Sequence, residues 1–381
     1  MSRAAFFFGS GISRASGAPM VADLTTSLLD GAWTPHTDGT FYPSPPDDGV
    51  KSIGVALRAQ EFLRLIKTEI DPHLLASDDR SANYEDVYAA ALQIVQDETR
   101  EIPNPLIRRT VLAIKQASRH LHVGQECHID ENPFASLADR ACDLVQWAVF
   151  FGLVRAKTPV GMDAISDVAR KADTMDVFTL NHERLIERQL MGGGISFVDG
   201  FGDRKGDVRI FDNRWSGERV RVLKLHGSTH WYLFRFNEWD QFAAVEANQG
   251  YAKDEHGRLL DSLDPKPLFL TGTTVKEQSY GVSLIGEIFS KFRELLSTHR
   301  TLICSGYGFT DKGINIRLNQ WLRDAEGNRI VVLHQDPEEE LPHKRFWFWR
   351  WSDYLRKGKV ILVHKWLADC TAADLEPYFD P

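Results

Sequence analysis

The sequence predicts an α/β fold: a Rossmann-like parallel sheet with helices on both faces, plus an inserted helical lobe. Short apolar runs such as residues 4–8 and 330–333 end in glycine or polar residues, which is typical of buried strands in a parallel sheet. Residues 52–171 show helical periodicity instead, and so long a segment between two strands indicates a separate lobe rather than a loop. With 43% hydrophobic and 26% charged residues, the chain has the composition of a globular protein.

The first predicted strand, residues 4–8, leads into a glycine-rich turn. Gly9 and Gly11 can adopt positive φ and, because they lack a side chain, can bring backbone N–H groups close to a pyrophosphate. Ser10 and Ser13 add hydroxyl groups without bulk. The turn therefore favours a phosphate-binding loop of a nucleotide site, with an ordinary glycine turn as the alternative.

Two common nucleotide motifs do not fit this turn. The dinucleotide fingerprint G-x-G-x-x-G fails because Arg14 stands where the third glycine is required. The P-loop pattern fails because no Lys-Ser or Lys-Thr pair follows. A simple Rossmann dehydrogenase and a P-loop NTPase are therefore both disfavoured.

The segment after the turn is predicted to be helical. Residues 21–30 have the apolar spacing of a short helix, and the prolines and paired acids of residues 31–50 indicate an irregular connection. Four further helices are predicted from apolar residues at helical spacing within residues 55–66, 84–95, 106–117 and 137–154. The predicted domains are a helical lobe at residues 31–171 and a Rossmann-type domain formed by residues 1–30 and 172–381.

Alternation of strands and helices resumes after the lobe. Strands are predicted at residues 175–180, 220–225, 268–270, 300–305 and 330–334. A helix at residues 184–191 follows the first of them and ends at three glycines. Several carboxyl ends should therefore converge on one crevice, where open α/β sheets bind ligands.

The residues that follow these strands are the candidate site. Asn181, His226 and Gly306 each directly follow a predicted strand, and Asp311 lies shortly after Gly306. Asn181 has a structural alternative as the N-cap of the helix behind it. His226 has one as a core histidine at the turn made by Gly227.

Four patches of the chain resemble the sirtuin family and stand in the sirtuin order. They are the turn at residues 9–19, the Thr-Leu-Asn-His-Glu segment at 179–183, the Lys-Leu-His-Gly-Ser segment at 224–228, and the Gly-Tyr-Gly-Phe loop with its aspartate at 306–311. Each patch is short, but their order along the chain is specific. The resemblance implies a sirtuin-like NAD-binding domain at residues 1–30 and 172–381.

The resemblance also implies roles for these residues. Gly9, Ser10, Gly11 and Ser13 would contact the NAD phosphates, and Gly306 with Asp311 would close the far side of the cofactor site. Asn181 would orient the ribose or a water, His226 would be the base, and Glu183 would support the loop. These roles fit the chemistry, because an oxocarbenium-like ribose favours a neutral amide beside it and the proton transfer needs a base of near-neutral pKa.

One departure from the family decides the expected reaction. Sirtuin deacetylases carry a four-cysteine zinc module after the catalytic histidine, whereas residues 229–266 contain no cysteine. We expect no zinc and no other metal site. Without a zinc lobe the acetyl-lysine groove lacks its second wall, so the resemblance favours hydrolysis of NAD to ADP-ribose and nicotinamide. Bacterial anti-phage NADases of the sirtuin type catalyse this hydrolysis.

Relatives of that kind deplete cellular NAD as effectors of defence. A sirtuin-like protein of this size with a helical lobe resembles the subunit encoded with a HerA-type ring ATPase, so the resemblance implies NAD as substrate, a homo-oligomer and such a partner. Two alternatives stay open. One is a non-catalytic module that senses NAD or an ADP-ribose derivative and gates a partner; the other is a zinc-independent deacylase or ADP-ribosyltransferase.

Charge and hydropathy exclude other classes. The net charge of −8 and the pI near 5.9 give no general attraction to nucleic acid or to an anionic membrane. The best apolar run, residues 144–154, is too short to span a bilayer, and the N-terminus lacks the features of a signal peptide. We expect a cytoplasmic protein with reduced cysteines.

Two further clusters have competing interpretations. His120, His122, Cys127 and His128 are metal-ligand types, but their spacing matches no standard zinc pattern, so exposed residues at a helix end are the preferred interpretation. Residues 343–351 interleave basic and aromatic side chains. This segment fits an oligomer or partner interface better than stacking on single-stranded nucleic acid.

Overall fold

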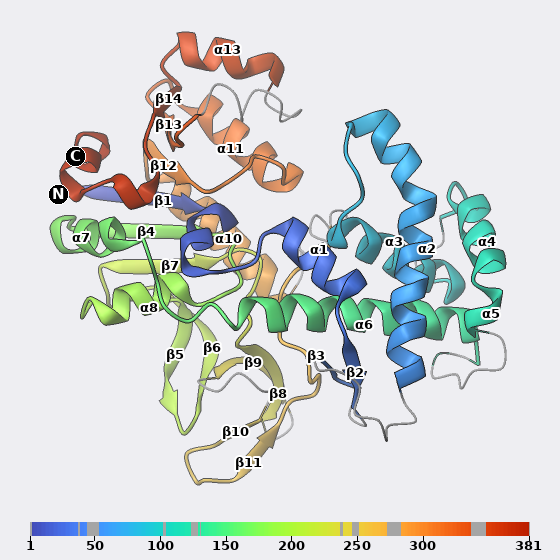
Figure 1. Ribbon diagram of the computed structural model, residues 1–381. Helices are drawn as coiled ribbons and strands as arrows, with labels where there is room; N and C mark the ends of the chain where they lie inside the picture. Colours follow the sequence, from blue (N-terminus) through green and yellow to red (C-terminus); the bar gives the residue numbers. More distant parts are fainter. Residues whose placement is uncertain are drawn as a thin grey trace. The chain divides into compact units, whose positions relative to one another are not determined.

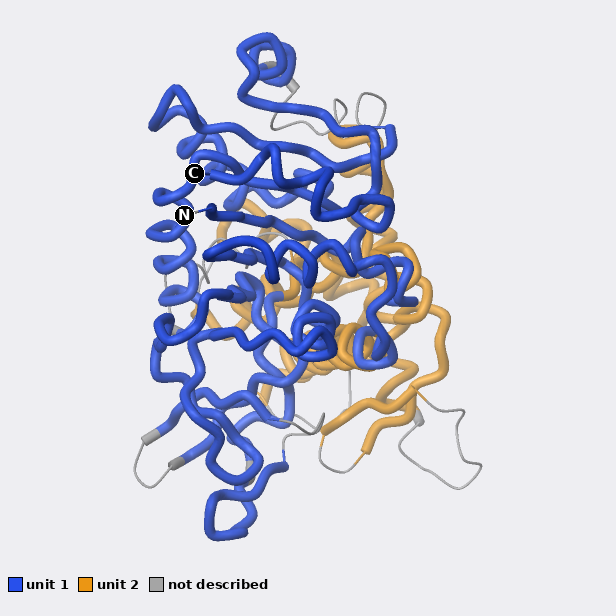
Figure 2. The backbone as a smooth tube through the Cα atoms, turned by 90° about the vertical axis from the view of Figure 1, so that its left-hand side faces the viewer, with its two compact units in different colours: residues 1–18, 153–270, 276–381 blue, residues 19–152, 271–275 orange. Residues whose placement is uncertain are grey.

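A computed structural model gives the fold of the chain in two compact units (Figure 2). It describes residues 2–36, 39–43, 53–101, 104–122, 129, 131–236, 239–245, 251–272, 283–336 and 348–380. The first unit comprises residues 1–18, 153–270 and 276–381, and the second comprises residues 19–152 and 271–275. The sequence predicts domain boundaries at residues 30 and 171, and these stay a prediction. The two units are defined by the density of contacts, which does not show which segments fold as independent domains.

The first unit is built on a six-stranded sheet in the order β14-β13-β12-β1-β4-β7 (Figure 1). All five strand pairs are parallel, which confirms the predicted α/β class and its Rossmann-like sheet. The strands are β1 (Arg3–Phe8), β4 (Thr174–Thr179), β7 (Val220–Lys224), β12 (Thr301–Ser305), β13 (Arg329–Leu333) and β14 (Val360–Val363).

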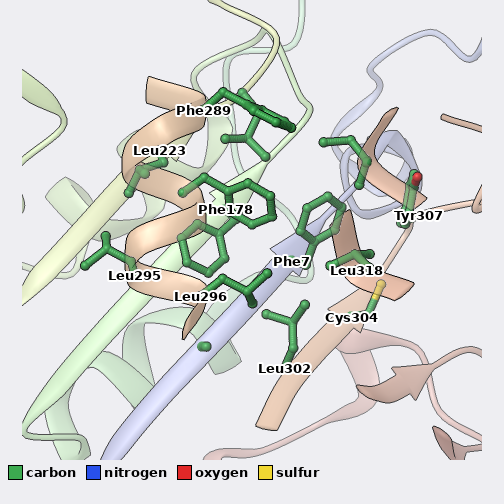
Figure 3. Packing of buried hydrophobic residues seen from close by; sticks show 14 of the residues in the cluster. Phe7, Phe178, Leu223, Phe289, Leu295, Leu296, Leu302, Cys304, Tyr307 and Leu318 are labelled. Carbon is green, nitrogen blue, oxygen red and sulfur yellow. The ribbon is translucent and has the colours of Figure 1, made fainter. Parts of the chain in front are cut away.

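Strand β1 is buried on both faces because its side chains alternate between two cores. Phe7 lies in one core together with Phe178 of β4 (Figure 3), and its ring centroid is 6.2 Å from that of Phe292 and 5.1 Å from that of Tyr307. Each such fully buried aromatic side chain stabilises the fold by about 2–3 kcal/mol. The helices on this face are α10 (Ser283–Ser297), α11 (Lys312–Asp324) and α13 (Phe348–Arg356).

The opposite face of the sheet carries the second core. Phe6 and Phe8 of β1 point there and stack on each other with ring centroids 5.2 Å apart. The elements that cover them are α7 (Asp163–Lys171), α8 (Leu185–Gly192), η2 (Leu367–Asp369) and α14 (Ala372–Leu375), followed by η3 (Glu376–Tyr378). Helices on both faces of the sheet are thereby confirmed.

Two features of the first unit differ from the sequence prediction. Residues 268–270 do not join the parallel sheet; they run beside the turn after β7, with a single antiparallel bridge between Gly227 and Phe269. The edge strand β14 is an addition to the predicted strands, although its sequence Val-Ile-Leu-Val is an apolar run of the same kind as theirs.

A second, antiparallel sheet is formed by strands within residues 200–245, most of which lie outside the family-like patches. Its strand order is β5-β6-β9-β8, in which β5 pairs with β6 and β8 pairs with β9. The strands are β5 (Gly200–Lys205), β6 (Val208–Arg214), β8 (Trp231–Phe236) and β9 (Trp239–Val245), and a separate hairpin is formed by β10 (Tyr251–Lys253) and β11 (Leu259–Asp261). The aromatic residues of 231–239 therefore belong to strands.

The second unit is mainly helical, in line with the predicted inserted lobe. It contains α1 (Val21–Asp30), β2 (Trp33–Pro35), β3 (Phe41–Pro43), α2 (Ile53–Asp78), α3 (Tyr84–Glu98), α4 (Arg108–Ala117), α5 (Arg119–His122) and most of α6 (Pro133–Leu153). The rings of Phe62 and Phe134 pack edge to face between α2 and α6. Within the described ranges, no helix combines the length and apolar character needed to cross a bilayer.

Candidate functional site

The carboxyl ends of four neighbouring strands place the predicted site residues along one edge of the sheet. Phe8, the last residue of β1, is paired with Thr179 on one side and with Ser305 on the other. Thr179 is paired in turn with Lys224. The turns that follow β1, β4, β7 and β12 therefore begin side by side.

The turns after β1 and β12 are packed directly against each other. N–H of Gly9 donates to the carbonyl of Ser305 at 3.1 Å, and N–H of Gly11 donates to that of Gly306 at 2.9 Å. A Cβ on Gly9 would lie 2.6 Å from the Gly306 oxygen, and one on Gly11 would lie 2.7 Å from the Gly306 Cα. Glycine is required here because the two backbones approach so closely.

This packing bears on the predicted phosphate contacts. The N–H groups of Gly9 and Gly11 already have backbone partners, so these residues shape the turn rather than offer free donors. Ser10 is exposed on the same turn and carries a hydroxyl group that a phosphate could reach. The binding role of these residues stays a prediction.

Ser13 connects two of the predicted catalytic residues. Nδ2 of Asn181 donates to Oγ of Ser13 at 2.9 Å, and that hydroxyl donates to Oε1 of Glu183 at 2.5 Å. All three side chains are buried, with exposed fractions of 1–5%. Ser13 therefore faces the site residues rather than solvent, a role that its place in a glycine turn did not reveal.

Asn181 does not cap the helix behind it. The N-cap position of α8 is occupied by Arg184, whose own side chain makes no capping hydrogen bond. Oδ1 of Asn181 is buried and has no hydrogen-bond partner among the described residues, while its amide nitrogen is engaged by Ser13. An unpaired buried carbonyl oxygen is costly, so this oxygen suits a donor from a bound molecule.

A buried lysine fixes the loop that carries these groups. Nζ of Lys224 donates to the carbonyl of Glu183 at 2.5 Å and lies 3.0 Å from Oε1 of Glu187. Lys224 and Glu187 are 2% and 4% exposed, respectively, at the side chain. Strand β7 also carries Arg221, so a second basic residue at its end does not stand out in the sequence. Only the structure shows that Lys224 is buried.

His226 lies at a tight turn directly after β7. Gly227 has a φ of +81°, and a Cβ there would lie 2.3 Å from the carbonyl oxygen of Leu268. N–H of Leu270 donates to the carbonyl of His226 at 2.8 Å, which explains why residues 268–270 leave the parallel sheet. The imidazole is 4% exposed and has Nε2 3.2 Å from Oδ2 of Asp311.

The structure thus brings the predicted residues together at one edge of the sheet. Asn181 and His226 each lie two residues beyond the paired Thr179 and Lys224, and the ring of His182 is 6.1 Å from that of His226. Asp311 comes from the turn after β12 and reaches the same imidazole.

A buried serine–histidine pair next to this turn is not a candidate nucleophile. Oγ of Ser228 lies 2.7 Å from Nδ1 of His230 and donates to the carbonyl of His182 at 3.0 Å. Burial and, after it, the nearby cations Arg184 and Lys224 hold the pKa of His230 well below its usual range. Because Ser228 is 0% exposed, the pair serves to tie two loops together.

The other clusters give no metal site among the residues that the structure describes. No group of three or more histidine, cysteine, aspartate or glutamate side chains there could hold an ion. His120 contacts Glu61 at 3.0 Å and His122 contacts the carbonyl of Lys115 at 3.1 Å. Cys127 and His128 lie outside the described residues, so the expected lack of zinc stays a prediction.

The basic aromatic segment is described only in part. Residues 343–347 lie outside the described residues. Trp351 is 5% exposed and packs in the core, with its ring 6.2 Å from that of Phe309. For Trp351 the predicted interface role is wrong, because the helical spacing of α13 turns it towards the sheet.

Comparison with known proteins connects part of this chain to one family. The model of the SIR2-like domain matches residues 176–354, which include Asn181, His226 and Asp311 but not the glycine turn. The chain is similar to a mutant of Sir2 homologues in complex with 2′-O-acetyl ADP ribose, with 13% identity and a TM-score of 0.37 over 98% of this chain and 89% of that chain.

Two other solved structures are similar at the same level. One is a Sir2 homologue in complex with NAD, with 13% identity and a TM-score of 0.36 over 99% of this chain and 89% of that chain. The other is a Sir2 homologue mutant in complex with ADP ribose, with 14% identity and a TM-score of 0.34 over 91% of this chain and 85% of that chain. The comparison with curated proteins gives no match.

Proposed function

We propose that this protein hydrolyses NAD to ADP-ribose and nicotinamide at the edge formed by the ends of β1, β4, β7 and β12. The observation that carries the proposal is the buried Oδ1 of Asn181, an acceptor without a hydrogen-bond partner among the described residues, beside the turn that holds His226. A ribose hydroxyl or the attacking water would supply the missing donor.

The chemistry follows from the two side chains. Cleavage of the bond between nicotinamide and ribose gives the sugar oxocarbenium character, and the neutral amide of Asn181 can orient that sugar without adding a second cation. His226 takes the proton of the ribose hydroxyl or of the water as a general base. Glu183 and Ser13 hold the Asn181 amide in place.

The reaction is proposed to end with water rather than with an acyl-lysine. Residues 229–266 contain no cysteine, and the described part of that stretch contributes β8 and β9 to the antiparallel sheet. This absence of cysteine supports hydrolysis over deacylation.

A cellular role is part of the same proposal. We propose an effector of bacterial anti-phage defence that acts in the cytoplasm, as a homo-oligomer, together with a HerA-type ring ATPase. The family resemblance of the motifs supports this role. Measuring nicotinamide release on size-resolved fractions with light scattering, with and without such an ATPase, tests the assembly.

Nicotinamide release from NAD, followed by chromatography, tests the activity itself. We expect Asn181→Ala and His226→Ala each to lower the turnover rate by roughly 100-fold or more. His256→Ala, which removes an exposed histidine in the β10–β11 turn, is the matched control and should keep full activity.

Other results would point to the alternatives. Full activity in both Asn181→Ala and His226→Ala would overturn the proposed site. Tight NAD binding by calorimetry without nicotinamide release, alone and with the ATPase, would indicate a sensing module. A radiolabelled or deacylated protein product would indicate a transferase or a deacylase.

A further inference from the structure

A carboxylate lies against the imidazole that we propose as the base. Oδ2 of Asp311 is 3.2 Å from Nε2 of His226, and the two side chains are 10% and 4% exposed. An imidazole that donates from one ring nitrogen to a carboxylate carries its proton there and keeps its lone pair on the other nitrogen. The contact therefore selects one tautomer of His226.

The other oxygen of this carboxylate is tied to a helix. Oδ1 of Asp311 accepts a hydrogen bond from N–H of Ile314 at 2.9 Å, which makes Asp311 the N-cap of α11. The cap restricts the side chain to conformations that face the first turn. Oδ2 is consequently directed at His226 before any substrate binds.

The loop before Asp311 is held by a second buried side chain. Nδ2 of Asn315 donates to the carbonyl of Phe309 at 2.7 Å, and the hydroxyl of Tyr307 donates to Oδ1 of Asn315 at 2.9 Å. Phe309 has a positive φ of 52°, which a bulky residue keeps only where its surroundings impose it. Asn315 is 0% exposed and sets the path of the loop.

The backbone that carries the imidazole is fixed as well. The N–H of Leu270 donates a hydrogen bond to the carbonyl of His226, and the next residue, Gly227, has a positive φ. Among the described residues, the titratable side chains seen against the ring are Asp311 from the turn after β12 and His182 from the turn after β4. Of the two, Asp311 brings the negative charge.

We propose that Asp311 is a positioning residue for His226, which it holds in the Nε2–H tautomer and whose imidazolium form it stabilises. The catalytic consequence rests on the proposed function, whereas the pairing itself does not. When the base takes a proton from the ribose hydroxyl or from water, that proton goes to Nδ1, and Asp311 stays ionised. The oxygen of the attacking water forms the new bond to the anomeric carbon of the ribose, while the bond to nicotinamide breaks and neutral nicotinamide leaves with the bonding electron pair.

The kinetic test uses Asp311→Asn, because asparagine also caps helices and keeps the shape of the side chain. Its turnover rate for nicotinamide release should fall roughly 100-fold or more, with a much smaller change in KM because asparagine keeps the shape of the side chain at the edge of the NAD site. The acidic limb of its pH–rate profile should move to lower pH, because loss of the carboxylate charge makes His226 a weaker base. Asp324→Asn, at the far end of α11, is the control.

A wild-type turnover rate and pH profile in Asp311→Asn would overturn the proposal. An independent readout is the ¹⁵N spectrum of the labelled histidines in the absence of NAD, with His226→Gln to assign the signal. We expect the Nε2–H tautomer in the wild type and a lower His226 pKa in Asp311→Asn. If the wild type lacks NAD hydrolysis but shows this tautomer, the pairing stands and the proposed function fails. The opposite tautomer would refute the pairing whatever the activity.

Discussion

At the scale of single residues, Ser13 decides how the site is arranged. Its hydroxyl accepts from the Asn181 amide and donates to the Glu183 carboxylate, so one oxygen atom connects the turn after β1 to the turn after β4. Both partners are at most 5% exposed, so they have little contact with bulk solvent. Loss of this hydroxyl would leave a buried amide and a buried carboxylate each short of a partner.

We therefore predict that Ser13→Ala lowers kcat/KM for nicotinamide release by roughly 10- to 100-fold, which corresponds to about 1.4–2.8 kcal/mol. Steady-state kinetics on the purified protein measures this change. Ser16→Ala is the matched control, because Ser16 lies in the same turn and accepts from N–H of Val160 instead. Equal losses in both variants would show that the turn, and not the Ser13 link, limits activity.

The residue scale also explains why some side chains escaped prediction. Lys224 and Glu187 form a buried pair under the loop. Lys224 begins the sirtuin-like segment 224–228, but the resemblance assigns a role to neither residue. Their importance depends on the strand and helix facing each other, and spacing along the chain does not contain that information. His226 and Asn181, by contrast, directly follow apolar runs, so their location at strand ends could be predicted.

At the scale of elements, the close contact between the turns after β1 and β12 shapes the edge of the sheet. Gly306 has a φ of +65°, and a Cβ there would lie 2.4 Å from the backbone nitrogen of Ile12. Gly358 has the same φ, but nothing lies within 4 Å of its Cβ position. An alanine at Gly358 would therefore test the effect of backbone conformation alone, whereas an alanine at Gly306 would add the effect of close packing.

Gly358→Ala should lower the free energy of unfolding by about 1–2 kcal/mol, the usual effect of an alanine at positive φ. Gly306→Ala should cost about 1–3 kcal/mol more, because the added methyl group collides with backbone that cannot move aside. Urea unfolding followed by circular dichroism measures both values. Similar losses in the two variants would mean that the turns are not packed as the structure has them.

At the scale of the whole molecule, a buried charge cluster joins the end of the chain to the sheet. Nε2 of His299 lies 2.7 Å from Oδ2 of Asp176, and its Nδ1 lies 3.4 Å from Oδ2 of Asp380. Asp380 also pairs with Arg3 through the backbone, and Arg221 forms a hydrogen-bonded ion pair with Asp176. The cluster connects segments that are far apart in the sequence.

This cluster should make stability depend on pH. Burial opposes the charged form of His299, but the hydrogen bond to Asp176 and the charge of Asp380 outweigh it and raise the pKa of His299 above its usual value of 6.5. Protonation therefore favours the folded state: the stabilisation is fully present below pH 6.5 and is lost as the pH rises through the raised pKa.

We expect the urea midpoint of the wild type to decrease above pH 6.5 and His299→Gln to lack this component. The control is His256→Gln, because the side chain of His256 is exposed and lies near Glu255, which is not part of the cluster. An unchanged pH dependence in His299→Gln would contradict the assigned charge state. Unfolding curves at several pH values between 6 and 9 provide the measurement.

By itself the sequence determined the α/β class, helices on both faces of the sheet, the helical character of the inserted segment and the strand ends that carry Asn181, His226, Gly306 and Asp311. These follow from local pattern, because apolar runs, glycines and helical periodicity act within a few residues. Only the tertiary structure decided the strand order, the antiparallel sheet, the Ser13 link, the Lys224–Glu187 pair and the contact of Asp311 with His226. Each of these joins residues distant along the chain, and their meeting depends on how strands and helices pack, which local pattern does not specify.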